Sequence, residues 1–215
     1  MASFDIAYHQ YIQPNEGGYA YIPGDKGGET YAGIARNFHP GWPGWHFIDL
    51  QKRNGPIRHN TKFPDIQYLV DDFYHSWWDE RYFGQISSQE VANILFDFNV
   101  NSDRAAIKTV QRLVNVTADG VMGQKTINAI NSTNPATLYS QLKTERKAFY
   151  DRIVQRDPSQ GKFYDGWMAR LATFQDLPIG GLGVVLGLGL LTWYLLSQSP
   201  GSEKKNRAPQ REQKI

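Results

Sequence analysis

The sequence contains no cysteine, which excludes a disulfide framework and a thiolate zinc site. Its first residues lack a basic start followed by an apolar run, so they are not expected to form a signal peptide. Excess basic charge is confined to residues 203–215, which hold five Lys or Arg and two Asp or Glu, whereas the rest of the chain carries one more acidic than basic side chain. A body this close to neutral has no basic stripe, so nucleic acid is not expected as a partner.

Metal-binding patterns are missing as well. The histidines show no His-x-x-x-His spacing, and no Ser/His/Asp or cysteine-based arrangement stands out. The sequence therefore predicts no metal and no cofactor, and it argues against a zinc amidase or a zinc endopeptidase. It also gives no sign of a serine or cysteine nucleophile.

One long uncharged run lies near the C-terminus. Twenty consecutive residues from Ile179 carry no charge, and a helix of that length spans the ~30 Å hydrocarbon core of a bilayer. We expect a transmembrane helix at residues 178–198 and a basic disordered tail at residues 199–215, with a buried apolar helix as the alternative. Gly183 and Gly187 have the small-xxx-small spacing that permits self-association in a membrane.

The remaining chain is predicted to be mostly helical with a small β element, an α+β fold. Residues 19–35 carry turn signals and predict a short β-hairpin, whereas residues 38–62, rich in Gly, Pro, Trp and His, are expected to be irregular. Ser87 and Glu90 predict a capping box. Apolar periodicity and end signals predict helices at residues 3–13, 65–82, 87–100, 103–115, 124–132, 135–156 and 161–175.

Glu16 is the acidic residue that the pattern singles out. Tyr8, Ile12 and Glu16 are four residues apart, so Glu16 continues an apolar row at the carboxyl end of the first helix. Burial and the negative end of the helix dipole both raise the pKa of a carboxyl group. A carboxyl that stays protonated near neutral pH can serve as a general acid.

The glycine pair after Glu16 has a matching interpretation. We expect Gly17 to turn the chain with a positive φ, and Gly18 to let a bulky polymer approach the carboxyl. The alternative is that Pro14 ends the helix earlier and leaves Glu16 as a solvated residue before the hairpin.

Four blocks of the chain resemble one known family. Residues 15–35, NEGGYAYIPGDKGGETYAGIA, resemble the signature of glycoside hydrolase family 108, the phage-type N-acetylmuramidases, although Ala32 stands where that family usually has Phe or Tyr. DDFYHSWWDERYF at residues 71–83 resembles the aromatic helix of the family. ILFDFNVNSDRAAIKTVQRLVNVTADGVMGQKTINAI at residues 94–130 resembles the accompanying peptidoglycan-binding region, and GKFYDGWMARL at residues 161–171 resembles its closing helix.

The resemblance implies a lysozyme-like fold and a function. The chain would be a muramidase that hydrolyses the β-1,4 bond between N-acetylmuramic acid and N-acetylglucosamine, in phage entry or host lysis. Glu16 carries over as the catalytic acid. The spacing of Glu16, Asp25 and Thr30 is similar to the Glu/Asp/Thr trio of phage lysozymes, which makes Asp25 the base or the stabiliser of the oxocarbenium-like transition state and gives Thr30 a water to hold. Glu29 competes with Asp25 as the second carboxylate.

The residues expected to contact the sugar are Gly18, Tyr19, Glu29, Tyr31, Asn99 and Asn101. For Asn99 and Asn101, which lie at the end of a predicted helix, capping of that helix is the alternative.

The resemblance also implies a domain order. We expect a catalytic region at residues 1–95 and a helical peptidoglycan-binding region at residues 96–176, followed by the transmembrane helix and the tail. The expected partners are peptidoglycan glycan strands and, through residues 178–198, a lipid membrane. The protein would then be anchored in a virion membrane or in the host inner membrane with its body facing the cell wall.

Topology and reaction type stay open at this stage. The basic tail favours a cytoplasmic C-terminus, yet no signal peptide is expected to carry the body across a membrane. Two alternative functions also remain, a lytic transglycosylase that forms 1,6-anhydro products and a non-catalytic cell-wall-binding protein.

Overall fold

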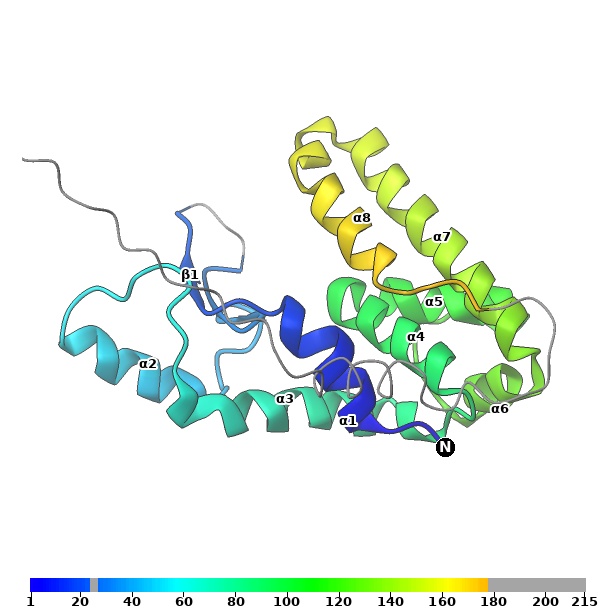
Figure 1. Ribbon diagram of the computed structural model, residues 1–215, viewed down its shortest axis with the longest axis horizontal. Helices are drawn as coiled ribbons and strands as arrows, with labels where there is room; N and C mark the ends of the chain where they lie inside the picture. The colour runs from blue at the N-terminus through cyan, green and yellow to red at the C-terminus, as the bar shows by residue number, and fades with distance from the viewer. Residues whose placement is uncertain (24–26, 178–215) are drawn as a thin grey trace, which may run out of the picture. The chain divides into compact units, whose positions relative to one another are not determined.

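The computed structural model describes residues 1–23 and 27–177. Helices dominate this part of the chain, and a small sheet lies near its N-terminal end (Figure 1). The helices are α1 (Phe4–Ala7), α2 (Gly44–Arg53), α3 (Gln67–Glu80), α4 (Gln89–Ser102), α5 (Arg104–Leu113), α6 (Gln124–Ser132), α7 (Pro135–Arg156) and α8 (Tyr164–Ala172). The strands are β1 (Tyr19–Tyr21), β2 (Glu29–Tyr31) and β3 (Ile34–Ala35).

The first helical segment changes its winding as it approaches Glu16. After α1 the chain continues as a π-helix at Tyr8–Ile12 and a 3₁₀ turn at Gln13–Asn15. Pro14 has no N–H to donate to a continuing helix, and Glu16 already adopts extended backbone angles of −89° and 129°. Glu16 therefore follows the helix end, as the alternative built on Pro14 anticipates, but its side chain is almost buried, with 12% exposed.

The expected hairpin is present as β1 and β2, and β3 extends it to an antiparallel sheet in the order β1-β2-β3. Tyr19 is opposite Tyr31, and Thr30 is opposite Ala20 on one side and Ala35 on the other. Because side chains alternate along a strand, Glu29 and Tyr31 lie on one face of β2 and Thr30 on the other.

Helix α4 forms the centre of the helical part and packs against α1, α5 and α7. All of its residues from Val91 to Asn99 are buried. Ser88, rather than Ser87, caps it, since the Ser88 hydroxyl accepts a hydrogen bond from the Val91 N–H at 3.3 Å. The expected boundary between residues 95 and 96 falls inside this helix.

The helix predictions differ in accuracy along the chain. Those at residues 124–132 and 135–156 are confirmed at both ends by α6 and α7. The last predicted helix begins as a 3₁₀ segment at Pro158–Phe163 and ends at Ala172. The expectation that residues 38–62 are irregular is wrong in its middle, because α2 lies there with Trp45 and Ile48 buried.

The fold class needs one correction. No helix within residues 1–23 and 27–177 is long and apolar enough to cross a membrane. The expected transmembrane helix at residues 178–198 and the tail at residues 199–215 lie outside the described residues. The structure is mostly helical with a three-stranded antiparallel sheet. The membrane helix is not supported, nor are the membrane contact, the self-association and the membrane-anchored location that depended on it.

Candidate functional site

The carboxyl group of Glu16 lies against the turn between β2 and β3. A Cβ atom placed on Gly33 in that turn would come within 2.0 Å of Glu16 Oε2 and 2.5 Å of the Tyr74 hydroxyl. Gly33 also has a φ of +76°, which L-residues with side chains rarely adopt. A glycine is therefore required here, because its missing side chain leaves the space that the Glu16 carboxyl occupies.

Tyr74, on α3, lies beside the Glu16 carboxyl and is itself buried. Its hydroxyl donates a hydrogen bond to the carbonyl oxygen of Ala32 at 2.8 Å. With its single proton used in this way, the hydroxyl oxygen can still accept a hydrogen bond. The Tyr74 oxygen can therefore accept a hydrogen bond from the O–H of a protonated Glu16 carboxyl.

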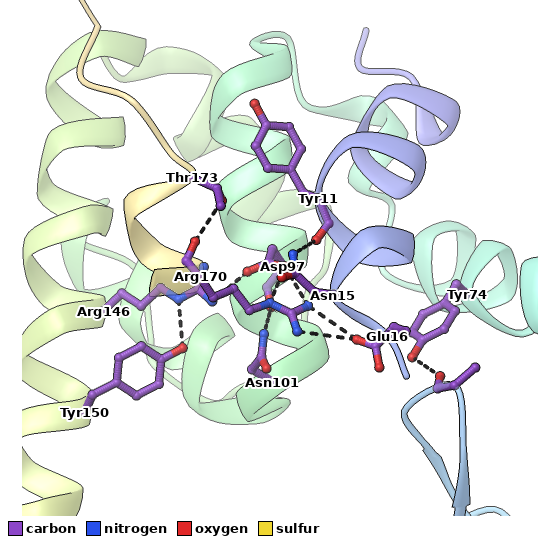
Figure 2. A network of polar contacts seen from close by, with 11 residues as sticks. Tyr11, Asn15, Glu16, Tyr74, Asp97, Asn101, Arg146, Tyr150, Arg170 and Thr173 are labelled. Atoms are coloured by element: carbon purple, nitrogen blue, oxygen red, sulfur yellow. Dashed lines mark hydrogen bonds and ion pairs between the residues drawn. The ribbon is translucent and has the colours of Figure 1, made fainter. Parts of the chain in front are cut away.

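A network of alternating charges connects Glu16 to the helical core (Figure 2). Arg170, on α8, places two guanidinium nitrogens 3.4 Å from Glu16 Oε1. The same guanidinium contacts Asp97 Oδ1 through Nε at 2.9 Å and through a terminal nitrogen at 2.8 Å. Asp97 Oδ2 lies 2.6 Å from a terminal nitrogen of Arg146, and both of these side chains are fully buried.

This environment sets the proton affinity of Glu16. Burial raises the pKa of the Glu16 carboxyl, the Arg170 charge opposes that rise, and the Asp97 charge adds to it. The balance leaves the pKa above its usual value, so the predicted direction is confirmed. The charges of Arg170 and Asp97 were not anticipated.

The pKa of Glu29 is shifted in the opposite direction to that of Glu16. Its Oε1 accepts a hydrogen bond from Tyr19 at 2.7 Å and contacts Lys52, and its Oε2 accepts one from Arg36 at 2.7 Å. Burial acts to raise the pKa of Glu29, but the hydrogen bonds from Lys52, Tyr19 and Arg36 outweigh it and hold the pKa below its usual value. Glu29 is thus an ionised member of an ion-pair cluster, on the wall of a cavity of about 860 Å³ that Tyr19, Arg36 and Lys52 also line.

The other expected residues of the glycine-rich stretch are placed as follows. Asp25 lies outside the described residues. Gly17 does not have a positive φ. A Cβ on Gly18 would come within 2.3 Å of the Thr61 carbonyl oxygen. The Gly18 N–H donates a hydrogen bond to Asn60 Oδ1 at 2.8 Å. The missing side chain of Gly18 thus lets the chain pack against residues 60–61.

Tyr31, Asn99 and Asn101 make structural contacts. Tyr31 is buried, stacks on Trp42 and Phe63, and accepts a hydrogen bond from the Phe63 N–H. The Asn99 amide donates to the Asp103 carbonyl at 2.9 Å, and the Asn101 amide donates to the Asp97 carbonyl at 2.7 Å. Both asparagines hold the end of α4 together, in line with the capping alternative.

Sequence reasoning missed four residues that surround Glu16. Gly33 comes from the turn between β2 and β3, and Tyr74, Asp97 and Arg170 come from three different helices. One signal was available, because Asp97 is the only charged residue between positions 91 and 100 in an otherwise apolar and amide-containing run. A carboxylate inside a buried helix requires a cationic partner, although the sequence does not say which one.

Comparison with known proteins places the two parts of the chain among known families. The family model described as "Glycosyl hydrolase 108" matches residues 9–102, and the one described as "Predicted Peptidoglycan domain" matches residues 105–172. Ten solved chains match the structure. One of them, titled "Structure of Brucella abortus SagA", has a TM-score of 0.57 and 23% identity, and the match covers 76% of this chain and 86% of that one. At this identity the likeness shows the fold. No curated protein matches the sequence. Residues 9–102, which hold Glu16, are thus similar to glycosyl hydrolase family 108 and residues 105–172 to a peptidoglycan domain, and together the two matches support a glycoside hydrolase that acts on peptidoglycan.

Proposed function

We propose that the protein is a muramidase that hydrolyses the β-1,4 bond between N-acetylmuramic acid and N-acetylglucosamine, with Glu16 as the general acid. The observation that carries this proposal is the nearly buried Glu16 carboxyl, whose pKa is raised. A carboxylic acid whose pKa is raised keeps its proton to higher pH, and it can then protonate the oxygen of a glycosidic bond. The two family matches support peptidoglycan as the substrate class, and the sugar bond itself is our inference.

The proposed reaction needs two proton transfers, one to the glycosidic oxygen and one from the attacking water. Glu16 donates its proton to the glycosidic oxygen as the bond from that oxygen to the anomeric carbon breaks. Water adds its hydroxyl group to the anomeric carbon and gives its other proton to a base. We assign that base, or the stabilisation of the oxocarbenium-like transition state, to Asp25, and we assign Thr30 to holding the water. If the two carboxyls act across a water, they lie about 6.5–9.5 Å apart.

The choice between Asp25 and Glu29 leads to a prediction. Replacing Asp25 by Asn should lower kcat by at least about tenfold, because the proton acceptor is lost. Replacing Glu29 by Gln should leave kcat near the parent value and lower the free energy of unfolding at pH 7 by about 1–2 kcal/mol, because charge-assisted hydrogen bonds to Lys52 and Arg36 are lost. Steady-state kinetics and urea unfolding measure the two effects.

The pH dependence provides a control for Glu29. Because folding depresses the pKa of Glu29, its contribution to stability is present above the unfolded-state pKa and is lost as the pH falls through the folded-state pKa. The Glu29→Gln protein should not show this loss of stability as the pH falls through the folded-state pKa of Glu29. An inactive Glu29→Gln protein beside a fully active Asp25→Asn protein would reverse the assignment.

Further parts of the proposal concern the rest of the chain. We assign catalysis to the N-terminal region and wall binding to the helical region that follows it, and we infer a setting in phage entry or host lysis from the resemblance alone. We leave Gly18 and Tyr31 out of the sugar contacts, because packing against residues 60–61 and stacking on Trp42 and Phe63 account for them.

The products released from purified sacculi test the function. Hydrolysis should release fragments with a reducing N-acetylmuramic acid end, as measured by mass spectrometry before and after borohydride reduction. Fragments lighter by the mass of one water, with 1,6-anhydro ends, would instead identify a lytic transglycosylase. Binding to sacculi without soluble fragments would overturn catalysis and leave a wall-binding protein.

A further inference from the structure

We propose that Arg170, with Asp97 behind it, is a positioning residue for the Glu16 carboxyl, so that α8 of the peptidoglycan-domain region completes the catalytic site. This inference rests on the proposed role of Glu16 as the acid. It gives the segment matched by the second family model a part in catalysis in addition to any wall binding.

The Arg170 guanidinium lies closer to Asp97 than to Glu16. Its two contacts with Asp97, at 2.8 and 2.9 Å, have the length of charge-assisted hydrogen bonds, whereas its two contacts with Glu16 are 3.4 Å long. Asp97 thus fixes the guanidinium, and the guanidinium interacts only weakly with Glu16 before reaction. When Glu16 gives up its proton, the carboxylate that forms faces a guanidinium already in place.

The charge balance of the buried network points the same way. Arg146 and Arg170 bring two positive charges and Asp97 one negative charge, so the network carries +1 while Glu16 is neutral and zero once it is ionised. Interactions that strengthen as charge develops lower the barrier, because they favour the transition state over the starting state. The network is therefore matched to the carboxylate that proton transfer produces.

Packing holds α8 in the position that this role requires. Just beyond the helix, Phe174 stacks on Tyr11 of the first helical segment, with ring centroids 4.6 Å apart. On the other side, Trp167 stacks on Tyr150 of α7 at 5.1 Å. These contacts connect α8 both to the segment that leads to Glu16 and to the helix that carries Arg146, so Arg170 is positioned by the fold.

Several groups lie around the Glu16 carboxyl. Arg170 from α8, Asp97 from α4 and Tyr74 from α3 shift its pKa. Tyr8 from the π-helix and Lys62 from the loop before α3 line the same small cavity. Among the causes that lower the pKa of Glu16, the charge of Arg170 is the largest. Removing that charge should therefore raise the pKa of Glu16 and leave its carboxyl less well oriented.

The test uses three variants of the full chain: Arg170→Met, Arg170→Lys and, as a matched control, Arg152→Met, whose arginine is partly exposed on α7. Arg170→Met should lower kcat by on the order of 10- to 100-fold with little change in KM, and it should move the alkaline limb of the pH–rate profile to higher pH. Arg170→Lys should keep the limb near its parent position and still lower kcat, because an ammonium cannot reproduce the two-nitrogen contact. Arg152→Met should behave like the parent.

Titration of Glu16 by carbon NMR in the same variants measures the coupling without using activity. A parent-like kcat and an unmoved alkaline limb in folded Arg170→Met would overturn the proposal. If circular dichroism shows that this variant is unfolded, Arg170→Lys decides, and a parent-like kcat there would overturn it. Failure of the proposed function is separable, because an active Glu16→Gln protein would refute the acid assignment even where Glu16 still titrates in response to Arg170.

Discussion

Replacing Glu16 by Gln is expected to lower kcat on peptidoglycan by about 10²–10⁴-fold, the usual contribution of a positioned general acid. Gln has nearly the same size and shape as Glu, so it fits the space beside Gly33. Its amide has no acidic proton to transfer to the glycosidic oxygen. The rate of release of soluble fragments from sacculi, measured over a range of substrate concentrations, separates this loss in kcat from a change in KM. Glu145→Gln, at a partly exposed position on α7, is the matched control and should be fully active.

The stability of the Glu16 variant separates lost chemistry from lost folding. Folding raises the pKa of Glu16, chiefly through burial, so its contribution to stability is full below the unfolded-state pKa and is lost as the pH rises through the folded-state pKa. Activity that needs the protonated form should fall over that same rise. Near neutral pH the neutral Gln side chain should therefore leave Tm equal to or above that of the parent, as often occurs when a catalytic residue is replaced. A Tm well below the parent value would attribute the inactivity to unfolding.

The sequence predicts Glu16, the proposed acid, but not the groups around its carboxyl. Glu16 is found from local spacing, because its position relative to Tyr8 and Ile12 predicts burial. Arg170 is distant from it along the chain, and no periodicity connects the two. Local sequence also does not show which glycine leaves space for the carboxyl. The neighbouring Gly17 and Gly18 do not provide that space. Gly33 does, and it reaches Glu16 only when β2 and β3 fold back.

Helices with clear end signals are predicted well, and helices that depend on packing are not. Helix α7 starts with Asn134, whose side chain accepts a hydrogen bond from Thr137, and with Pro135 in its first turn, so its start can be predicted from the sequence. Helix α2 has no side-chain cap and follows Pro43 in a stretch rich in Gly and Trp. Its buried Trp45 is held by a hydrogen bond to the His39 carbonyl, a contact that local propensity does not show.

Replacing Asp97 by Ala should have the largest effect on stability. The change removes the counter-charge of Arg146, which is fully buried, and of Arg170, which is 13% exposed. Breaking a buried ion pair by removing one partner costs about 3–5 kcal/mol, because the remaining charge stays desolvated. Since domains of this size are stable by about 5–15 kcal/mol, urea unfolding should show the loss directly, together with a lower Tm. A free energy of unfolding within about 1 kcal/mol of the parent would show that the buried guanidiniums do not depend on Asp97.

A double variant tests whether Asp97→Ala loses stability because a buried charge is left without a partner or because packing is lost. In Asp97→Ala with Arg146→Met, the buried guanidinium is removed along with its partner, and a Met side chain suits the rings of Phe98, Tyr150 and Phe174 that surround Arg146. The double variant should therefore recover at least about 2 kcal/mol relative to Asp97→Ala alone. Its kcat should stay low, because Arg170 no longer has the carboxylate that fixes its guanidinium beside Glu16. Recovery of kcat along with stability would mean that Asp97 acts on the fold and not on the position of Arg170.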